Sequence, residues 1–173
     1  MSKEIIFISI AALLFLPLLG EAANGNSAAL AALSYLGRAG LPRGMRNNNP
    51  GNIRKGNTPW KGKIPHNRNT DSAFEQFETY AYGIRAMIKN IVSYNRDRGI
   101  DTLRGVISTW APSSENDTDK YINFVALRTG IAPDETIRFD QNTLRGIVIA
   151  MAAMENGREA ITPAQFNYAY SLI

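Results

Sequence analysis

"NTLRGIVIAMAAMENG", residues 142–157, is the most hydrophobic of the helical segments that the sequence predicts. Its apolar residues Leu144, Val148 and Met151 are spaced by four and three, and Glu155 follows four residues later. This spacing places all of them on one face of a helix. The face is apolar up to its last turn, and Gly157 is a typical residue for the end of a helix. The segment therefore predicts a helix that buries its apolar face and carries a half-buried carboxylate at its C-terminal end.

Helical patterns also occur in other parts of the chain. Apolar residues repeat at spacings of three and four from Phe77 to Ile91, and Gly99 ends that stretch. Further helices are expected at residues 102–110, at residues 118–130 with Thr118 as the cap, and from residue 162 onward. No alternating strand pattern is longer than four residues. The sequence therefore predicts a mainly α fold.

An irregular region precedes these helices. "RGMRNNNPGNIRKGN", residues 43–57, is rich in Asn and Gly, which tolerate left-handed backbone angles, and Pro50 restricts the residue before it. Such a run cannot form the interior of a helix or strand. Irregular chain is expected from residue 42 to residue 71, with room for a small hairpin. The segment is either a linker or an ordered loop that binds something.

The first 22 residues have the pattern of an export signal. Lys3 is followed by an apolar stretch from Ile5 to Leu19, with Gly20 and Ala22 at the spacing of a cleavage site. A stretch of fifteen residues falls short of the roughly 20 that span a membrane comfortably. Residues 1–22 are therefore a cleaved signal or a signal-anchor that associates with a membrane through residues 5–19. Residues 23–42 form a short helical lead-in and residues 43–173 one domain, which is exported and is periplasmic or membrane-anchored.

The composition excludes several kinds of site. The chain has no Cys, so it has neither disulfides nor a thiolate nucleophile, and it has one His, His66. A zinc site needs several such ligands, so no metal and no cofactor is expected, and His66 is expected to be a solvated loop residue. The net charge of +4 suits a protein that acts on an anionic polymer or surface, but does not choose among nucleic acid, cell wall and membrane.

Two carboxylates are candidates for chemistry. Glu155 lies at the end of an apolar face and near the negative end of a helix dipole, and both features favour the protonated carboxyl that a general acid needs. Alternatively, Glu155 is an exposed residue of the last helical turn. Glu115 lies in the loop before residue 118 and is the second candidate. Glu75 and Glu78 flank Phe77 away from the apolar stripe and are expected to be solvated.

Several motifs together resemble a known family. These are "GMRNNNPGNIR" at 44–54, Trp60 with Gly62, "FEQFETYAYGIRAM" at 74–87 and "WAPSSENDTDKYINFV" at 110–125. In this order they resemble phage-associated proteins, cell-wall-degrading or structural, of the lysozyme-like superfamily. The resemblance covers roughly residues 44–157 and implies an α+β lysozyme-like fold.

A more distant resemblance is to lytic transglycosylases, whose sugar groove is completed by a segment of the type Glu-Thr-x-x-Tyr-Val. Here Thr118 falls on the Thr of that pattern and Tyr121 on its Tyr. The Asn-Pro-Gly-Asn-Ile string also resembles a loop that lines the groove of wall glucosaminidases. The resemblances, with the loop's polar and basic side chains, give the residues expected to bind a glycan strand: Asn48, Asn49, Asn52, Arg54, Trp60, Tyr121 and Thr118.

The order of the motifs departs from that of those enzymes. Their catalytic Glu ends a hydrophobic helix that precedes the other motifs, whereas no Glu occurs here between Ala22 and Asp71. The similar helix end, Glu-Asn-Gly, lies at the other end of the domain, at Glu155. We therefore expect a permuted lysozyme-like arrangement in which Glu155 returns beside the Asn-rich loop, with Glu115 as the second catalytic candidate.

The function that follows is cleavage of the peptidoglycan glycan strand, by a muramidase or a lytic transglycosylase, for local opening of the cell wall. Peptidoglycan is the expected partner, with virion or envelope proteins as further ones. The main alternative is a non-catalytic virion or envelope protein that keeps the fold in order to bind peptidoglycan. Binding of nucleic acid through the basic loop is a third interpretation, against which the export signal argues.

Overall fold

The computed structural model describes residues 26–173, in which helices enclose one hydrophobic core. The predicted signal or anchor at residues 1–22 lies outside the described residues. Residues 26–32 are helical, and the remaining helices are α2 (Arg43–Arg46), α3 (Tyr80–Arg98), α4 (Leu103–Trp110), α5 (Thr118–Thr129), α6 (Gln141–Asn156) and α7 (Pro163–Tyr170). The prediction of a mainly α fold is confirmed.

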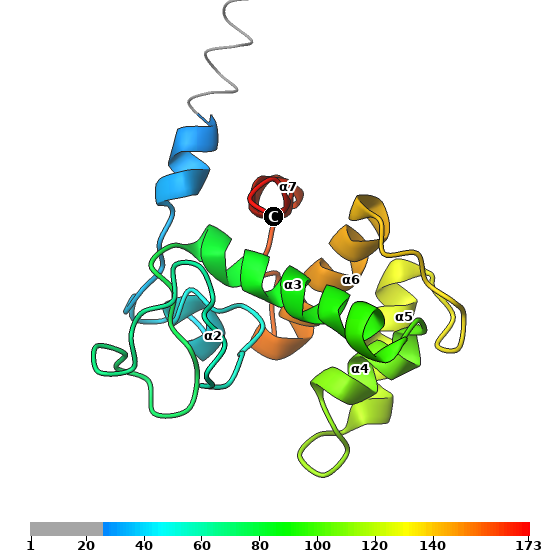
Figure 1. Cartoon of the computed structure of the whole chain (residues 1–173). Helices are drawn as coiled ribbons and strands as arrows, with labels where there is room; N and C mark the ends of the chain where they lie inside the picture. The colour runs from blue at the N-terminus through cyan, green and yellow to red at the C-terminus, as the bar shows by residue number, and fades with distance from the viewer. Residues whose placement is uncertain (1–25) are drawn as a thin grey trace, which may run out of the picture.

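Helix α6 lies at the centre of the helical part. It packs against α5, α7, α3 and α2, and α3 runs across it (Figure 1). Ile147, Val148 and Met151 on α6 have no exposed surface, and neither do Ile88 and Ile91 on α3. Full burial of such a side chain contributes about 1.5–3 kcal/mol. The hydrophobic segment at residues 142–157 therefore forms the centre of the core.

The helix ends follow the local sequence. Gly99, Gly130 and Gly157 adopt left-handed angles after α3, α5 and α6. Thr102 caps α4 by accepting from the N–H of Gly105. At α5, however, the cap is Asp117, which accepts from the N–H of Lys120. Thr118 is instead the first helical residue and is buried, and its hydroxyl donates to the carbonyl of Ala111 at 2.6 Å.

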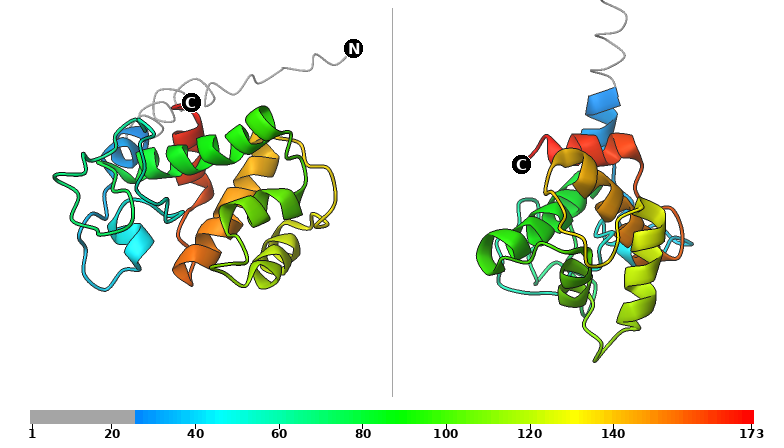
Figure 2. Two further views of the ribbon diagram at one scale, coloured as in Figure 1. Left: turned by 60° about the horizontal axis from the view of Figure 1, so that its bottom comes forward. Right: turned by 90° about the vertical axis from the view of Figure 1, so that its right-hand side faces the viewer.

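Residues 47–79 form an irregular but fixed half of the domain. Within the described residues no strand forms, and the expected hairpin is replaced by the isolated bridges Arg54–Phe74 and Lys63–Phe77. Figure 2 shows this loop region beside one end of α3, on the opposite side from α4 and α5. Its interior is polar: Asn47, Asn48, Asn49, Glu75 and Gln76 are all buried. The segment 43–57 is thus an ordered part of the domain and not a linker.

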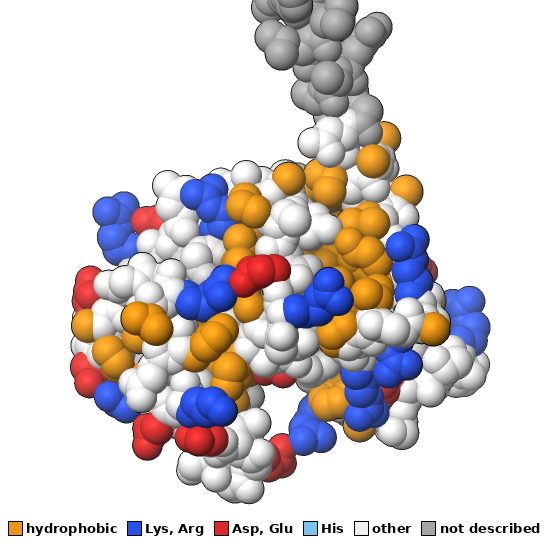
Figure 3. Space-filling model, turned by 180° about the vertical axis from the view of Figure 1, so that it is seen from behind, with side chains coloured by type: hydrophobic (Ala, Val, Ile, Leu, Met, Phe, Trp, Pro, Cys, Tyr) orange, Lys and Arg blue, Asp and Glu red, His pale blue; other side chains and the backbone are white. Residues whose placement is uncertain are grey.

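The described part of the lead-in, residues 26–42, packs against the start of α3 and against α7. Leu30 and Leu33 lie with Tyr80 of α3 and Tyr168 of α7 around a small apolar crevice. On the face shown in Figure 3, hydrophobic side chains gather just below the N-terminal end of the described residues. Across residues 26–173, no helix combines the length and the hydrophobicity that a membrane crossing requires.

Candidate active site

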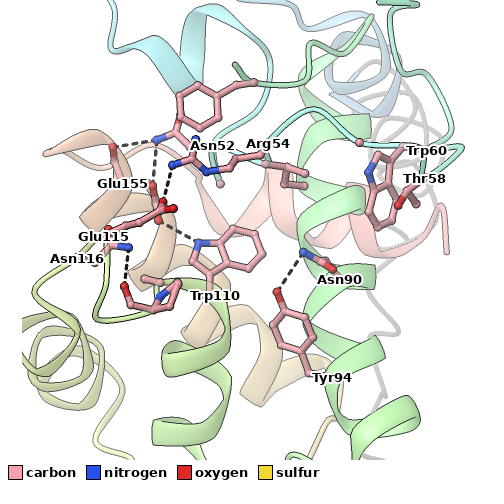
Figure 4. Close-up of a pocket in the computed structure, with 16 residues that line it drawn as sticks. Asn52, Arg54, Thr58, Trp60, Asn90, Tyr94, Trp110, Glu115, Asn116 and Glu155 are labelled. Carbon is pink, nitrogen blue, oxygen red and sulfur yellow. Dashed lines mark hydrogen bonds and ion pairs between the residues drawn. The ribbon is translucent and has the colours of Figure 1, made fainter. Parts of the chain in front are cut away.

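A pocket of about 740 Å³ opens where the Asn-rich loop meets the C-terminal ends of α4 and α6. Glu155, in the last turn of α6, lies on its wall together with Asn52 from the loop and Trp110 from the end of α4 (Figure 4). The volume lies within the range of sites for small ligands. The fold thus brings Glu155 back to the Asn-rich loop, about a hundred residues earlier in the chain.

Both carboxylate oxygens of Glu155 accept hydrogen bonds. The Nδ2 of Asn52 donates to Oε2 at 3.0 Å, and the Nε1 of Trp110 donates to Oε1 at 3.0 Å. The hydroxyl of Tyr121, on α5, donates to the same Oε1 at 3.0 Å. Three different segments therefore fix the orientation of a half-buried carboxylate at the pocket wall.

The Tyr121 hydroxyl has a second acceptor within reach. It lies 3.3 Å from the carbonyl oxygen of Met151 on α6. Tyr121 is almost fully buried, and burial followed by the adjacent charge of Glu155 raises the pKa of its hydroxyl well above the usual value. The hydroxyl therefore keeps its proton, which it can direct to either oxygen.

Two features of the backbone hold the loop against the helices. Asn52 has a left-handed φ of 48°, which Asn tolerates better than most residues. Gly51 lies so close to the indole of Trp110 that a Cβ atom there would come within 2.7 Å of Cζ2. In addition, the Nδ2 of Asn156 donates to the carbonyl of Pro50 at 2.8 Å. These contacts fix Asn52 relative to Glu155.

The rest of the pocket offers aromatic faces and a charged pair. Trp60 and Phe74 line it from the loop region, and Tyr94 lines it from α3. Arg54 donates to Glu115 at 2.5 Å, and both side chains are more than half exposed. In Figure 4 this pair lies near Glu155, whereas Trp60 lies at the far end of the pocket. Aromatic faces with polar groups between them are suited to binding a sugar chain.

No protein-family model matches the chain. It is similar to "Protein P5" of Pseudoalteromonas phage PM2, with 39% identity over 143 residues that make up 77% of this chain and 87% of the phage protein. The chain belongs to the family of this phage protein. The name of this relative specifies no reaction.

The structure places some of the residues that the sequence singled out at the pocket, and others away from it. Glu155, Glu115, Asn52, Arg54 and Trp60 all line the one pocket. Tyr121 reaches it through Glu155. Thr118 does not line the pocket, because its side chain fixes the turn before α5.

Asn48 and Asn49 also lie away from the pocket, in the interior, with no exposed surface. The amide of Asn48 donates to Ser34 and to the carbonyl of Phe77, and that of Asn49 donates to the carbonyls of Ile53 and Glu75. These two residues hold the loop together and do not contact a ligand. The expectation that they bind sugar is corrected, since their polar atoms are used within the protein.

Other pocket residues were missed by the sequence reasoning. Asn90 and Tyr94 lie one helical turn apart on α3 and are joined by a hydrogen bond of 3.2 Å. They lie on a partly exposed side of that helix, where polar residues are expected in any case. Phe74 was also missed. Among the described residues no group of three or more His, Asp or Glu could hold a metal ion.

Proposed function

We propose that the protein cleaves the glycan strand of peptidoglycan and that Glu155 is the general acid. The observation that carries this proposal is the contact of Glu155 with Asn52, Trp110 and Tyr121 on the wall of the pocket. Three donors fix the orientation of its carboxyl group at the end of an apolar helix and beside aromatic faces, which places it to exchange a proton with a glycosidic oxygen. The resemblance to lysozyme-like enzymes is an analogy of motifs and adds to this argument.

The proposed reaction has two steps. A protonated Glu155 gives its proton to the glycosidic oxygen as the bond to the sugar carbon breaks. The carboxylate then takes a proton from the 6-hydroxyl of the sugar, which closes an anhydro ring, or from water, which gives a hydrated end. Tyr121 can serve both protonation states of Glu155. Its hydroxyl can donate to the carboxylate, or it can turn to the carbonyl of Met151 and accept from the protonated carboxyl group.

Glu155 is preferred to Glu115 on physical grounds. Glu115 is exposed and its carboxylate is already engaged in an ion pair with Arg54, whereas Glu155 is half-buried and has no cation beside it among its hydrogen-bond partners. The place of Glu115 in the same pocket suits binding or the stabilisation of positive charge on the sugar. In this proposal the site is assembled in an order permuted relative to lysozymes, with the acid after the groove-lining loop.

The proposed setting is the opening of the cell wall by a phage. The relationship to a protein of phage PM2 is compatible with a place in a virion. An exported or membrane-anchored protein of the envelope would meet the same substrate. The peptidoglycan strand is the proposed partner in both cases.

Replacement of Glu155 tests the proposal directly. Glu155→Gln keeps the size of the side chain but removes the acid, and it should lower clearing of a peptidoglycan suspension by about 10²–10⁴-fold. Glu78→Gln removes an exposed carboxylate outside the pocket; it is the matched control and should retain the activity. If Glu155→Gln clears the suspension as fast as the unchanged protein, Glu155 is not the acid.

Two further outcomes distinguish the alternatives. A released strand with an anhydro end would be about 18 Da lighter than a hydrated one, which separates transglycosylase from muramidase. If the unchanged protein does not clear the suspension but sediments with the wall, the protein is a non-catalytic virion or envelope component that binds peptidoglycan.

A further inference from the structure

Glu75 is a buried carboxylate that the proposed reaction does not use. Its side chain has no exposed surface, contrary to the expectation that it is solvated. A charge buried in this way is strongly destabilising unless it is paired and hydrogen-bonded. Glu75 accepts from the N–H of Gly56 at 2.9 Å, from the Nε2 of His66 at 3.1 Å and from the Nζ of Lys63 at 3.4 Å.

These three donors come from one irregular segment of the chain, residues 56–66. Thr58 and Trp60 lie in the middle of this segment and line the far end of the pocket (Figure 4). Lys63 also donates to the carbonyl of Gly56 at 3.0 Å, which closes the segment into a loop around Trp60. One carboxylate thus ties both ends of the loop that carries Trp60.

The main chain of Glu75 fixes the other side of the pocket. Its N–H donates to the carbonyl of Ile53 at 2.8 Å, and its carbonyl accepts from the amide of Asn49 at 2.9 Å. Ile53 follows Asn52, the residue that donates to Glu155. Glu75 therefore connects the loop of Trp60 with the loop that orients the proposed acid.

We propose that Glu75, together with Lys63 and His66, is a positioning unit that holds Trp60 at the pocket wall and so sets the affinity for the glycan strand. His66 is exposed, as the sequence indicated, and its contact with Glu75 makes it a part of this unit. The part of the proposal that concerns the glycan rests on the proposed function. The part that concerns Trp60 does not.

The first test needs no substrate. The chain has two Trp residues, so Trp110→Phe leaves Trp60 as the only one, and Trp60 is partly buried. In that background Glu75→Gln removes the charge and turns an amide group toward Lys63 or Gly56. Trp60 emission should then move to longer wavelength, and its quenching by acrylamide should rise about two-fold or more.

The control is Glu78→Gln, which removes an exposed carboxylate three residues away and should leave both signals unchanged. Lys63→Met and His66→Leu keep Glu75 and remove one donor each, and they should give smaller changes of the same sign. If Glu75→Gln does not fold, these two variants test the proposal in its place. Unchanged Trp60 signals in a folded Glu75→Gln protein, or in both donor variants, would overturn the proposal.

The second test uses the protein with both Trp residues. Glu75→Gln should raise the peptidoglycan concentration for half-saturation about five-fold or more, in sedimentation and in clearing. The maximal rate should change by less than the half-saturation concentration does. An equal loss of both would contradict a positioning role at Trp60. If Glu155→Gln shows that the protein is no glycosidase, the sedimentation and Trp60 measurements still decide this proposal.

Discussion

The two halves of the domain are stabilised by different means. In the helical half, from α3 to α7, the core consists of aliphatic side chains such as Ile147 and Val148 with no exposed surface. In the loop region, residues 47–79, most buried side chains are amides or a carboxylate, with Asn48 and Glu75 fully buried. Apolar packing is non-directional, whereas a buried polar group must find a partner in one geometry. The loop region is therefore built to hold exact positions, and it carries one wall of the pocket.

The largest effect is expected where the two halves meet. A Cβ atom on Gly83 of α3 would lie 1.7 Å from the carbonyl oxygen of Asn48, so Gly83→Ala has to push the loop away from the helix. We expect a loss of about 4 kcal/mol or more in the free energy of unfolding.

The matched control for this change is Gly146→Ala in the middle of α6. Its Cβ atom would meet only the methyl group of Thr129, at 3.6 Å. The higher helix propensity of Ala should then stabilise the protein by up to about 1 kcal/mol. Urea unfolding of both variants measures the difference, and similar values for the two would show that the junction is less tight than the structure indicates.

A somewhat smaller effect is expected at Asn48. Asn48→Gly tolerates the left-handed φ of 51° but loses the bonds to Ser34 and Phe77 and leaves the N–H of Tyr35 without its acceptor. The expected loss is about 3 kcal/mol. Ile88→Val, a change in the fully buried apolar core, should cost about 1 kcal/mol. If the apolar change costs more, the loop region is not the more sensitive half.

Acid should weaken the loop region through Asp71. The guanidinium of Arg43, at 2.7 Å, and the amide of Asn47 hold the pKa of this carboxyl well below its usual range. A lowered pKa in the folded state adds stability above the unfolded value of about 3.9, and this stability is lost as the pH falls below it.

Asp71→Asn should therefore cost about 2 kcal/mol at pH 7 and flatten the fall in stability below about pH 4. Thermal unfolding of both proteins between pH 2 and pH 7 measures this. An equally steep fall in the variant would assign the acid sensitivity to other groups.

The smallest effect on stability is expected at the rim of the pocket. Arg54 and Glu115 are exposed, so their ion pair should contribute less than about 1 kcal/mol, and less still at high salt. Arg54→Gln should unfold at nearly the same urea concentration as the unchanged protein. A large loss of stability would mean that the pair is needed to hold the Asn-rich loop to the segment before α5.

The helices could be predicted because their signals are local. The apolar spacing of residues 144–151, the glycines at 99, 130 and 157 and the Thr-Pro start of α7 each act within a turn or two of the chain. The face of Glu155 could be predicted for the same reason. Its position beside the Asn-rich loop was expected from motif resemblance, and in the structure Asn52 of that loop donates to Glu155.

The roles within the Asn-rich loop could not be predicted. Asn48, Asn49 and Asn52 have the same side chain and neighbouring positions, yet two are buried and one faces Glu155. Irregular chain has no period that separates an inner from an outer face, so local sequence carries no signal for this choice. The burial of Glu75 could not be predicted either, because it depends on partners at positions 56, 63 and 66.

The helices from α3 to α7, most of their ends and the carboxylate on the last turn of the most apolar helix follow from local sequence, because backbone propensity and side-chain period act over short distances. The tertiary structure alone decided which polar side chains are buried and which line the pocket. A polar group is buried only where a partner from another part of the chain satisfies it, and that partner is chosen by the packing of the whole domain.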